Sequence, residues 1–322
     1  MLKRVATSAS TILINRNSKN LLLLRRGPTA KFVPHSYVFP GGVLEKDLDS
    51  QFPLHLTNYD EIEAPQVIPN GMENDFSIRV CSLRELFEET GLLFVTEKNS
   101  TKKGVLSASD DKILQNMQNK VKNNPLLFKD IFNDFNLDLE ILKCWAHWLT
   151  PCTLPFQFET IFYMVDVDKD YKINLCTKEM VDFSWMNPGN VLSNPNVRNY
   201  LPPPQLYEMC KIHWSIHENY EKDLNLVWPQ AIFSNDPIHP DIYAFPGDHL
   251  FIENIPEELK YKKRILTFEE IDSYSKDKKI HRILYNDLKG LQLSKMMVRN
   301  FGPNDENKPK ILEYLLKFDS KK

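Results

Sequence analysis

The sequence predicts an α/β sandwich. Strand-like apolar runs and helix-like amphipathic segments alternate in mixed order along the 322 residues, which is the pattern of sheets covered by helices. Apolar residues make up 42% and charged residues 26% of the chain, as in ordinary globular proteins, and a chain of this length can bury a substantial core. No internal repeat or low-complexity tract interrupts this pattern.

The N-terminal half is expected to place two strands and one helix around a loop. In order, the expected elements are two strands over 6–24 around a polar turn at 15–20, an irregular proline-punctuated stretch up to Gly41-Gly42, an inserted loop over 47–75, and a helix over 76–90 that ends at Gly91. The inserted loop is polar and acidic, contains three prolines and shows no sustained period, so it is predicted to be a surface segment.

The C-terminal half continues the mixed order. In order, we expect helical structure over 108–136, strands over 141–148, 160–167 and 183–185, a helix over 205–219, strands at 250–252 and 281–285, and a last helix over 309–318. The strand over 160–167 is strongly apolar, which predicts a central position in the sheet. The helical segment 108–136 is expected to be a second insertion or a lid. We assign residues 1–255 to one domain and 256–322 to a C-terminal extension packed on it.

Charge and cysteine content narrow the possible partners and compartments. The net charge of −3 is too small to steer the whole molecule onto nucleic acid, so a nucleic-acid partner is not expected. The five cysteines form no CxxC pair, which argues against a disulfide framework and a zinc site and favours a reducing, intracellular compartment. No apolar run is long enough to span a membrane, and no signal-peptide region follows the basic start.

The helix over 76–90 carries the most informative pattern. At about 100° per residue, Glu85, Glu88 and Glu89 fall within roughly a third of the helix circumference. The opposite, apolar side is expected to face the core, and its residues are Val80, Leu83, Leu86 and Phe87. Three carboxylates that close together repel one another unless a cation lies among them, and Mg²⁺ prefers such oxygen ligands. Arg84 precedes Glu88 by one turn and is placed to orient it.

A solvated acidic face is the alternative to a metal site. Glu88-Glu89 alone would favour that alternative, because acidic clusters on helices are usually exposed to solvent. The full spacing Arg-Glu-x-x-Glu-Glu-x-Gly over residues 84–91 should arise by chance in only about one chain in several thousand of this length. The pattern therefore favours a metal-binding function.

This helix resembles the second half of the Nudix box, and Phe39-Pro40-Gly41-Gly42 resembles the entrance to its first half. The resemblance implies a Nudix α/β/α sandwich with a mixed sheet. It also implies a Mg²⁺ cofactor, for which Mn²⁺ can substitute. The residues it implies as metal ligands are Glu85, Glu88, Glu89 and the carbonyl of Gly41 or Gly42. The residues it implies as catalytic are Glu85, Arg84 and, as a loop carboxylate that positions the attacking water, Glu179. A surface salt bridge is the alternative role for Glu179.

Two features depart from the usual box. The glutamate expected six positions after the second glycine is replaced by Leu48, and Asp47 and Asp49 flank that position as candidate replacements. The spacer before Arg84 is also about 28 residues longer than usual because of the proline-containing insertion.

Further motifs resemble the acyl-coenzyme A diphosphatase branch, the nucleoside diphosphate-linked moiety X motif 19 type. They span about residues 6–290 and include Arg26-Gly27-Pro28, Trp148-Leu149-Thr150-Pro151, Glu159-Thr160-x-Phe162-Tyr163, Leu201-Pro202-Pro203-Pro204-Gln205, Pro246-Gly247-Asp248 and His281-Arg282. This resemblance implies hydrolysis of coenzyme A or acyl-coenzyme A to 3′,5′-ADP and (acyl-)4′-phosphopantetheine. Arg26 and Lys31 are the candidate substrate-binding residues; an ordinary exposed base is the alternative role for each.

Several alternatives stay open at this point. Another nucleotide conjugate, such as ADP-ribose, NADH or a capped RNA end, is a competing substrate, and a catalytically silent Nudix-fold binding module is a competing function. Relatives of this branch often end in the peroxisomal signal Ser-Lys-Leu, whereas this sequence ends in Ser320-Lys321-Lys322. Peroxisome, mitochondrion and cytoplasm are therefore all retained as compartments. The oligomeric state and acyl-chain preference are not readable from the sequence.

Overall fold

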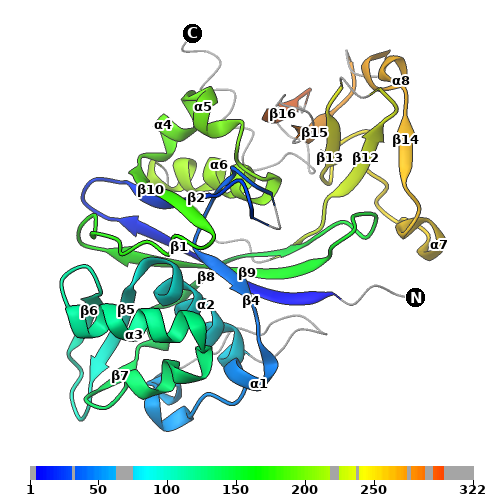
Figure 1. Cartoon of the computed structure of the whole chain (residues 1–322). Coiled ribbons are helices and arrows are strands. Elements are labelled where there is room, and N and C mark those ends of the chain that lie inside the picture. Colours follow the sequence, from blue (N-terminus) through cyan, green and yellow to red (C-terminus); the bar gives the residue numbers. More distant parts are fainter. Residues whose placement is uncertain are drawn as a thin grey trace.

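The fold is built on one large mixed sheet with helices on both faces (Figure 1). The structure is a computed structural model, and it describes residues 5–30, 33–62, 75–217, 225–236, 239–273, 277–286 and 293–300. The predicted final helix over 309–318 lies outside these residues. Among the described residues, no helix combines the length and the apolar character that a membrane span requires.

The large sheet has eight strands. Six form a continuous path in the order β10 (Met180–Met186), β2 (Leu21–Arg26), β1 (Ala6–Asn15), β9 (Phe158–Val167), β8 (Lys143–Leu149) and β11 (Leu226–Val227). Two short strands, β3 (Tyr37–Val38) and β4 (Gly41–Val43), pair with β2 and β1 respectively. The predicted central position of the strand over 160–167 is confirmed, because β9 lies between β1, to which it is parallel, and β8, to which it is antiparallel.

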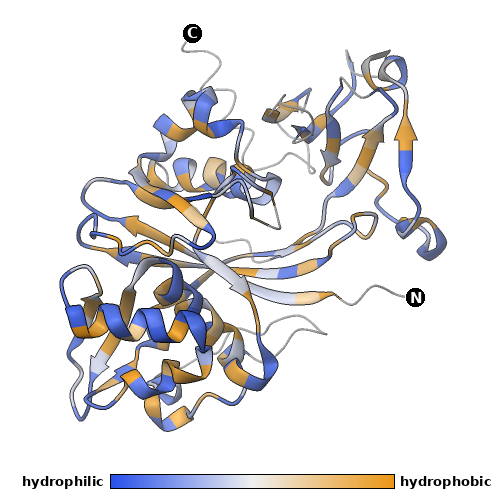
Figure 2. Ribbon diagram, viewed as in Figure 1, coloured by the Kyte–Doolittle hydropathy of each residue, from blue (hydrophilic) through white to orange (hydrophobic). Residues whose placement is uncertain are grey.

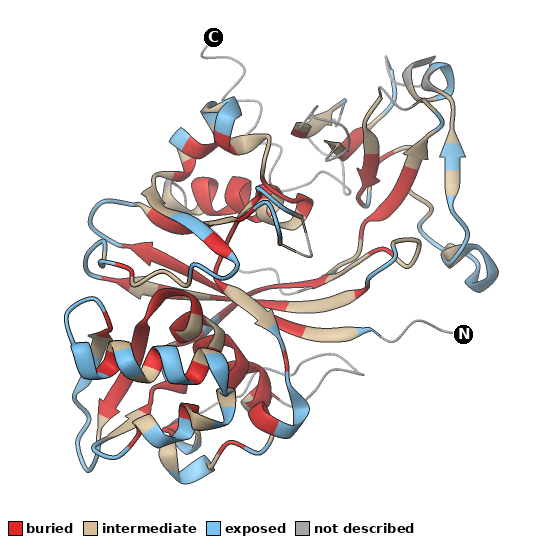
Figure 3. Ribbon diagram, viewed as in Figure 1, coloured by how far each residue is buried: buried red, intermediate tan, exposed pale blue. Residues whose placement is uncertain are grey.

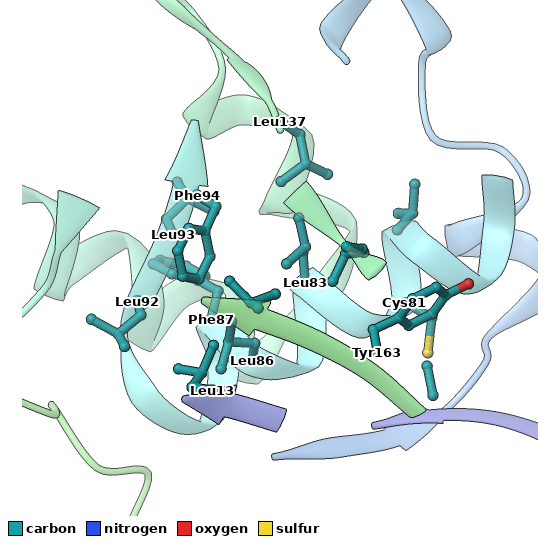
Figure 4. Close-up of a cluster of buried hydrophobic side chains, with 14 of the residues drawn as sticks. Leu13, Cys81, Leu83, Leu86, Phe87, Leu92, Leu93, Phe94, Leu137 and Tyr163 are labelled. Atoms are coloured by element: carbon teal, nitrogen blue, oxygen red, sulfur yellow. The ribbon is translucent and has the colours of Figure 1, made fainter. Parts of the chain in front are cut away.

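Successive side chains along the strands of the large sheet project alternately into two separate hydrophobic cores, one on each face. Ala9 and Leu13 of β1 belong to the core under helix α2 (Asp75–Thr90), which we call the α2-side core. Ile12 and Ile14 of the same strand belong to the core under helix α6 (Pro203–His217), the α6-side core. This period of two is what a strand buried on both faces produces. Figure 3 shows the buried strands between these layers, and Figure 4 shows the α2-side core, to which Leu13 of β1, Leu86 of α2 and Tyr163 of β9 all contribute.

A buried carboxylate anchors α6 to the sheet. Glu208 of α6 is fully buried and accepts hydrogen bonds of 2.7 Å from the indole N–H groups of both Trp145 and Trp148. Lys211, one turn further along the helix, lies 2.9 Å from the same carboxylate. A charge taken out of water needs such partners, so these two tryptophans have a polar as well as an apolar role.

The segment over 108–136 is part of the α2-side layer. It forms helix α3 (Lys112–Asn123) and the 3-10 helix η3 (Pro125–Ile131), next to a three-stranded sheet of β6 (Lys103–Ser107), β5 (Leu92–Glu97) and β7 (Phe135–Leu137). Asp111 caps α3 by accepting hydrogen bonds from the N–H groups of Ile113 and Leu114. Figure 2 shows α3 with both hydrophilic and hydrophobic bands, and its Gln118 bonds the end of α2 at Phe87 and Glu88.

The prediction of a surface loop over 47–75 is wrong for the part that the structure describes, which is residues 47–62 and 75. Residues 46–62 form helix α1 (Lys46–Asp49) and two 3-10 helices, η1 (Leu54–Leu56) and η2 (Tyr59–Glu61). Phe52 is 6% exposed, and its ring centroid lies 5.6 Å from that of Phe128 and 5.7 Å from that of Phe132. Asn58 is buried and donates to Asp138 at 2.6 Å. A few anchoring side chains thus outweigh the polar composition of the segment.

The C-terminal part contains a five-stranded sheet. Its order is β14 (Arg264–Leu266), β12 (Gln230–Ser234), β13 (Asp241–Ala244), β15 (Ile280–Asn286) and β16 (Leu293–Arg299). Strands from both sides of residue 255 pair in this sheet. The predicted strand at 250–252 does not form, because the N–H of Ile252 bonds the side chain of Gln230 instead of a strand partner.

The remaining helices are short. They are α4 (Pro188–Ser193) and α5 (Pro195–Arg198) beside α6, the 3-10 helix η4 (Leu139–Ile141) before β8, and α7 (Glu257–Lys260) and α8 (Phe268–Ser273) at the five-stranded sheet.

The five-stranded sheet joins the α6 layer through an aromatic and ionic contact. Arg282 donates two hydrogen bonds of 2.8 Å to the fully buried Asp248. His281 stacks on Phe245 at 5.1 Å between centroids and lies 3.3 Å from the hydroxyl of Tyr207 in α6. Its Nδ1 donates to the carbonyl of Pro246 at 2.8 Å, and burial lowers the pKa of His281 to about 4.

We predict that Phe52→Ala lowers the free energy of unfolding by about 3 kcal/mol, because it leaves a cavity beside the rings of Phe128 and Phe132. Leu54→Ala, two residues along and 46% exposed, is the matched control and should change stability by less than about 0.5 kcal/mol. Denaturant unfolding measures both. Equal, small losses in the two variants would restore the surface-loop interpretation.

A second prediction concerns acid stability. The folded pKa of His281 lies near 4 and the unfolded value near 6.5, so the unfolded chain takes up the proton first. Stability should therefore fall as pH drops from about 6.5 towards 4, by up to about 3 kcal/mol from this group. His281→Asn should flatten that part of the curve relative to wild type in unfolding experiments at a series of pH values. Parallel curves would exclude His281 as the cause.

Candidate active site

Helix α2 presents its acids as predicted and buries its apolar side. Val80, Leu86 and Phe87 are fully buried, and Leu83 is 1% exposed. Figure 4 shows Leu83, Leu86 and Phe87 in the α2-side core. The helix ends at Gly91, whose φ of +73° is a left-handed conformation that favours glycine, and whose N–H bonds the carbonyl of Phe87 at 2.8 Å. The predicted helix is thus confirmed, and it starts at Asp75.

The two glycines of β4 bring its backbone against the acids. A Cβ at Gly42 would lie 2.4 Å from the carboxyl carbon of Glu85, so a larger residue at this position would displace that carboxylate. The N–H of Gly41 donates to Glu89 at 2.9 Å, and a Cβ at Gly41 would lie 2.3 Å from the carbonyl oxygen of Ala9 in β1. The double glycine therefore lets one strand approach both its neighbouring strand and the acidic side of α2.

Arg84 lies at the centre of the site and is 1% exposed. Its guanidinium makes two hydrogen bonds to Asp49, of 2.8 and 2.9 Å, and donates to Glu85 at 2.8 Å and to Glu88 at 2.9 Å. Asp49 is fully buried and also accepts from the N–H of Glu45. Of the two aspartates that flank Leu48, Asp49 therefore orients the arginine, whereas Asp47 is exposed.

Glu89 is buried and Glu85 and Glu88 are partly buried, and their hydrogen-bond partners do not fully compensate for the hydration that the three carboxylates lose. Burial raises the pKa of Glu85 to about 7, and Glu88 adds to the rise while Arg84 opposes it. Burial likewise raises the pKa of Glu88. Burial and the neighbouring Glu85 raise the pKa of Glu89 well above its usual value, against the opposing effects of the Gly41 N–H and Arg26. Such a group of carboxylates is stabilised by any cation that enters it.

Arg26 and Glu179 belong to the same site. Both act electrostatically on Glu89, Arg26 lowering and Glu179 raising its pKa. The connection is structural, because Met180 pairs with Arg26 between β10 and β2, and the N–H of Gly27 donates to the carbonyl of Glu179 at 2.8 Å. The structure thus brings together Arg26, Arg84, Glu85, Glu88, Glu89, Glu179 and Gly42 of the predicted site residues. Lys31 lies outside the described residues.

Glu45 was missed by the sequence reasoning. This exposed residue precedes α1 and raises the pKa of Glu88, so its carboxylate faces the acidic side of α2. Its position three residues after Gly42 was the available signal, because a chain that turns past the acids keeps its next side chains near them.

The chemical type of the side chains at α2 suits a hard divalent cation. The acidic side chains gathered at α2 offer carboxylate oxygens, which Mg²⁺ prefers, and a cation would relieve their repulsion. Within the described ranges, no group of three or more His, Cys, Asp or Glu residues is already arranged to hold a metal ion. Arg84 occupies one oxygen of both Glu85 and Glu88. These two side chains would have to turn from Arg84 to offer that oxygen to a cation.

Comparisons with known proteins agree with this geometry. Residues 4–212 match the family described as the NUDT19 Nudix domain. A Caenorhabditis elegans protein named "Putative nudix hydrolase 7" is 30% identical over 254 residues, which cover 77% of this chain and 75% of that protein. The Xenopus laevis protein named acyl-coenzyme A diphosphatase NUDT19 is 25% identical, with 85% of this chain and 82% of that protein covered.

A solved structure supports the same fold. The Nudix hydrolase of Alicyclobacillus acidocaldarius superimposes with a TM-score of 0.53 at 20% sequence identity, covering 66% of this chain and 93% of that one. The predicted α/β Nudix sandwich is therefore confirmed. Since the family match covers more than half of the chain and includes the glycine strand, the acidic helix and Glu179, this protein belongs to the Nudix hydrolase family, in its NUDT19 branch, and is a Nudix diphosphatase.

Proposed function

We propose that this enzyme hydrolyses the diphosphate bridge of coenzyme A or acyl-coenzyme A in a Mg²⁺-dependent reaction. The products are 3′,5′-ADP and 4′-phosphopantetheine or its acyl derivative. The observation that carries the proposal is the group of three glutamates on α2, one buried and two partly buried, packed against the glycine strand β4. The choice of substrate is supported by relatives: the Xenopus laevis and Homo sapiens proteins that match over most of the chain are both named acyl-coenzyme A diphosphatase.

Different residues of the site would bind the cation and position its ligands in such a reaction. Glu85, Glu88 and Glu89 would hold Mg²⁺, with the carbonyl of Gly42 assisting, and Mn²⁺ would substitute. When bound, the cation supplies charge neutralisation at the phosphate oxygens and an acidified water. Asp49 and Arg84 position Glu85 and Glu88, since the guanidinium bonds all three carboxylates.

Two further residues act beside Glu89. Arg26 is the cation placed to meet the diphosphate, because it already acts electrostatically on Glu89. Glu179 is a carboxylate in the same place and is our candidate to orient the attacking water and accept its proton.

We expect Glu89→Gln to lower kcat/KM by at least about 100-fold, because it removes a proposed ligand of the cation that neutralises charge on the phosphate oxygens. Its unfolding free energy without metal should hold or rise, since the variant removes a buried, poorly compensated charge. Glu97→Gln, on the 43% exposed Glu97 of β5, is the matched control and should behave as wild type. Activity that survives a chelator, or full activity of Glu89→Gln, would contradict the metal assignment.

The substrate is tested with coenzyme A, acyl-coenzyme A, 3′-dephospho-coenzyme A and ADP-ribose, with products identified by mass. We expect the highest kcat/KM for coenzyme A or its acyl esters. Arg26→Gln should lower kcat/KM for all four by about 10- to 100-fold, because the diphosphate is common to them. Arg16→Gln, in an exposed ion pair at the far end of β1, is the control. Faster cleavage of ADP-ribose than of coenzyme A by the wild type would refute the coenzyme A proposal and leave the Nudix diphosphatase in place.

A further inference from the structure

His147 of β8 and Glu159 of β9 form a polar pair on the large sheet outside the group of acids described above. Nε2 of His147 lies 2.9 Å from a carboxylate oxygen of Glu159. The two residues are diagonal neighbours, because His147 pairs with Ile161 and Leu149 pairs with Glu159. The histidine is 2% exposed and the glutamate 15% exposed, so the glutamate is the member that reaches solvent.

The pair lies on the face of the sheet that carries the active site. Ile161, two residues after Glu159, belongs to the α2-side core, whereas Phe162 and Trp148 belong to the α6-side core. Side chains alternate along a strand, so His147 and Glu159 project to the α2 side together with Ile161. The acids of α2 lie over this same face.

The strand register sets the distance from the glycine strand. Glu159 pairs with Thr7 of β1, and Ala9 of β1 pairs with Gly42. Glu159 is therefore two strands across and two residues along from Gly42, a Cα separation of about 12 Å. That separation places Glu159 beside the group of acids around Gly42, and its carboxylate is held there by His147. The separation is a suitable distance for a group that extends from the diphosphate.

The hydrogen bonding of the pair is incomplete. With Nε2–H donating to Glu159, Nδ1 of His147 is an acceptor, and among the described residues it has no hydrogen-bond partner. A buried histidine is most often a core residue with both nitrogens satisfied, and an unsatisfied buried polar atom costs about 1–3 kcal/mol. His147 leaves one nitrogen unsatisfied, so its position is not explained by packing alone. Its other nitrogen orients the carboxylate of Glu159, and the exposed part of that carboxylate can accept a hydrogen bond.

We propose that Glu159 is a specificity-determining residue that contacts the substrate, and that His147 is its positioning residue. The inference rests on the proposed diphosphatase function. A carboxylate repels phosphate, so Glu159 would accept a hydrogen bond from a neutral donor, a hydroxyl or an amide N–H, on the group beyond the diphosphate. In coenzyme A such donors occur on both sides, as the ribose hydroxyl and as the hydroxyl and amides of the pantetheine arm.

The test compares Glu159→Gln and Glu159→Ala with wild type on the conjugate that the wild type cleaves fastest. We expect KM to rise about 10-fold or more in Glu159→Ala and less in Glu159→Gln, with kcat changed less than about threefold. His147→Gln should raise KM by an intermediate factor. Asp166→Asn is the matched control, since Asp166 is a carboxylate on the same strand that pairs with Arg16 and Lys143.

Product binding separates the two sources of the donor and requires no turnover. Calorimetry with 3′,5′-ADP and with 4′-phosphopantetheine should show that Glu159→Ala weakens one of them about 10-fold, which identifies the side of the substrate that Glu159 contacts. Unchanged KM and unchanged affinity for both products, in variants with wild-type unfolding curves, would reduce the pair to a structural role and overturn the proposal. A fall in kcat at constant KM would also overturn it. Failure of the coenzyme A proposal appears separately, as a different preferred substrate of the wild type.

Discussion

The buried guanidinium of Arg84 is the interaction on which the active site depends. A single cation, 1% exposed, is shared by Asp49 of α1, at the start of the insertion, and by Glu85 and Glu88 of α2. Burying these carboxylates without it would be unfavourable by several kcal/mol, because each charge loses its hydration. The arginine therefore makes the acidic face of α2 compatible with a folded protein before any metal arrives. It also fixes two of the three glutamates in direction.

The insertion changes how this arrangement is built. Asp49 is supplied by α1, and the chain then leaves the site and is anchored by Phe52 and Asn58. Asp49 thus lies between two fixed points, β4 and the aromatic group of Phe52, Phe128 and Phe132. Its carboxylate is held by the packing of the insertion as well as by Arg84.

The local chemistry was predictable from sequence, and the long-range packing was not. Helical periodicity placed Glu85, Glu88 and Glu89 on one side of α2 and its apolar residues in the core, because both depend on a rotation of about 100° per residue. The burial of Phe52 was missed because a single aromatic residue in a polar, proline-containing stretch carries no periodic signal. Similarly, no pattern indicated that Ile252 would bond a side chain, or that Glu208 would take both indole N–H groups. Such contacts join residues 22 to 80 positions apart, and only the folded topology brings them together.

The parallel pairing of β1 with β9 has a consequence for biosynthesis. Ten consecutive residues near the start of the chain, Ala6–Asn15, pair with Phe158–Val167, so the edge of β1 that faces β9 has no partner until about half of the chain has been synthesised. Loop closure over about 150 residues is slow relative to local helix formation. Apolar strands with an unpaired edge are prone to aggregate during that time. Until β9 emerges, the nascent β1 can pair only with the nearby strands β2 and β4. The enzyme is therefore expected to acquire its active site late, in one step that joins its two halves, rather than as the chain emerges.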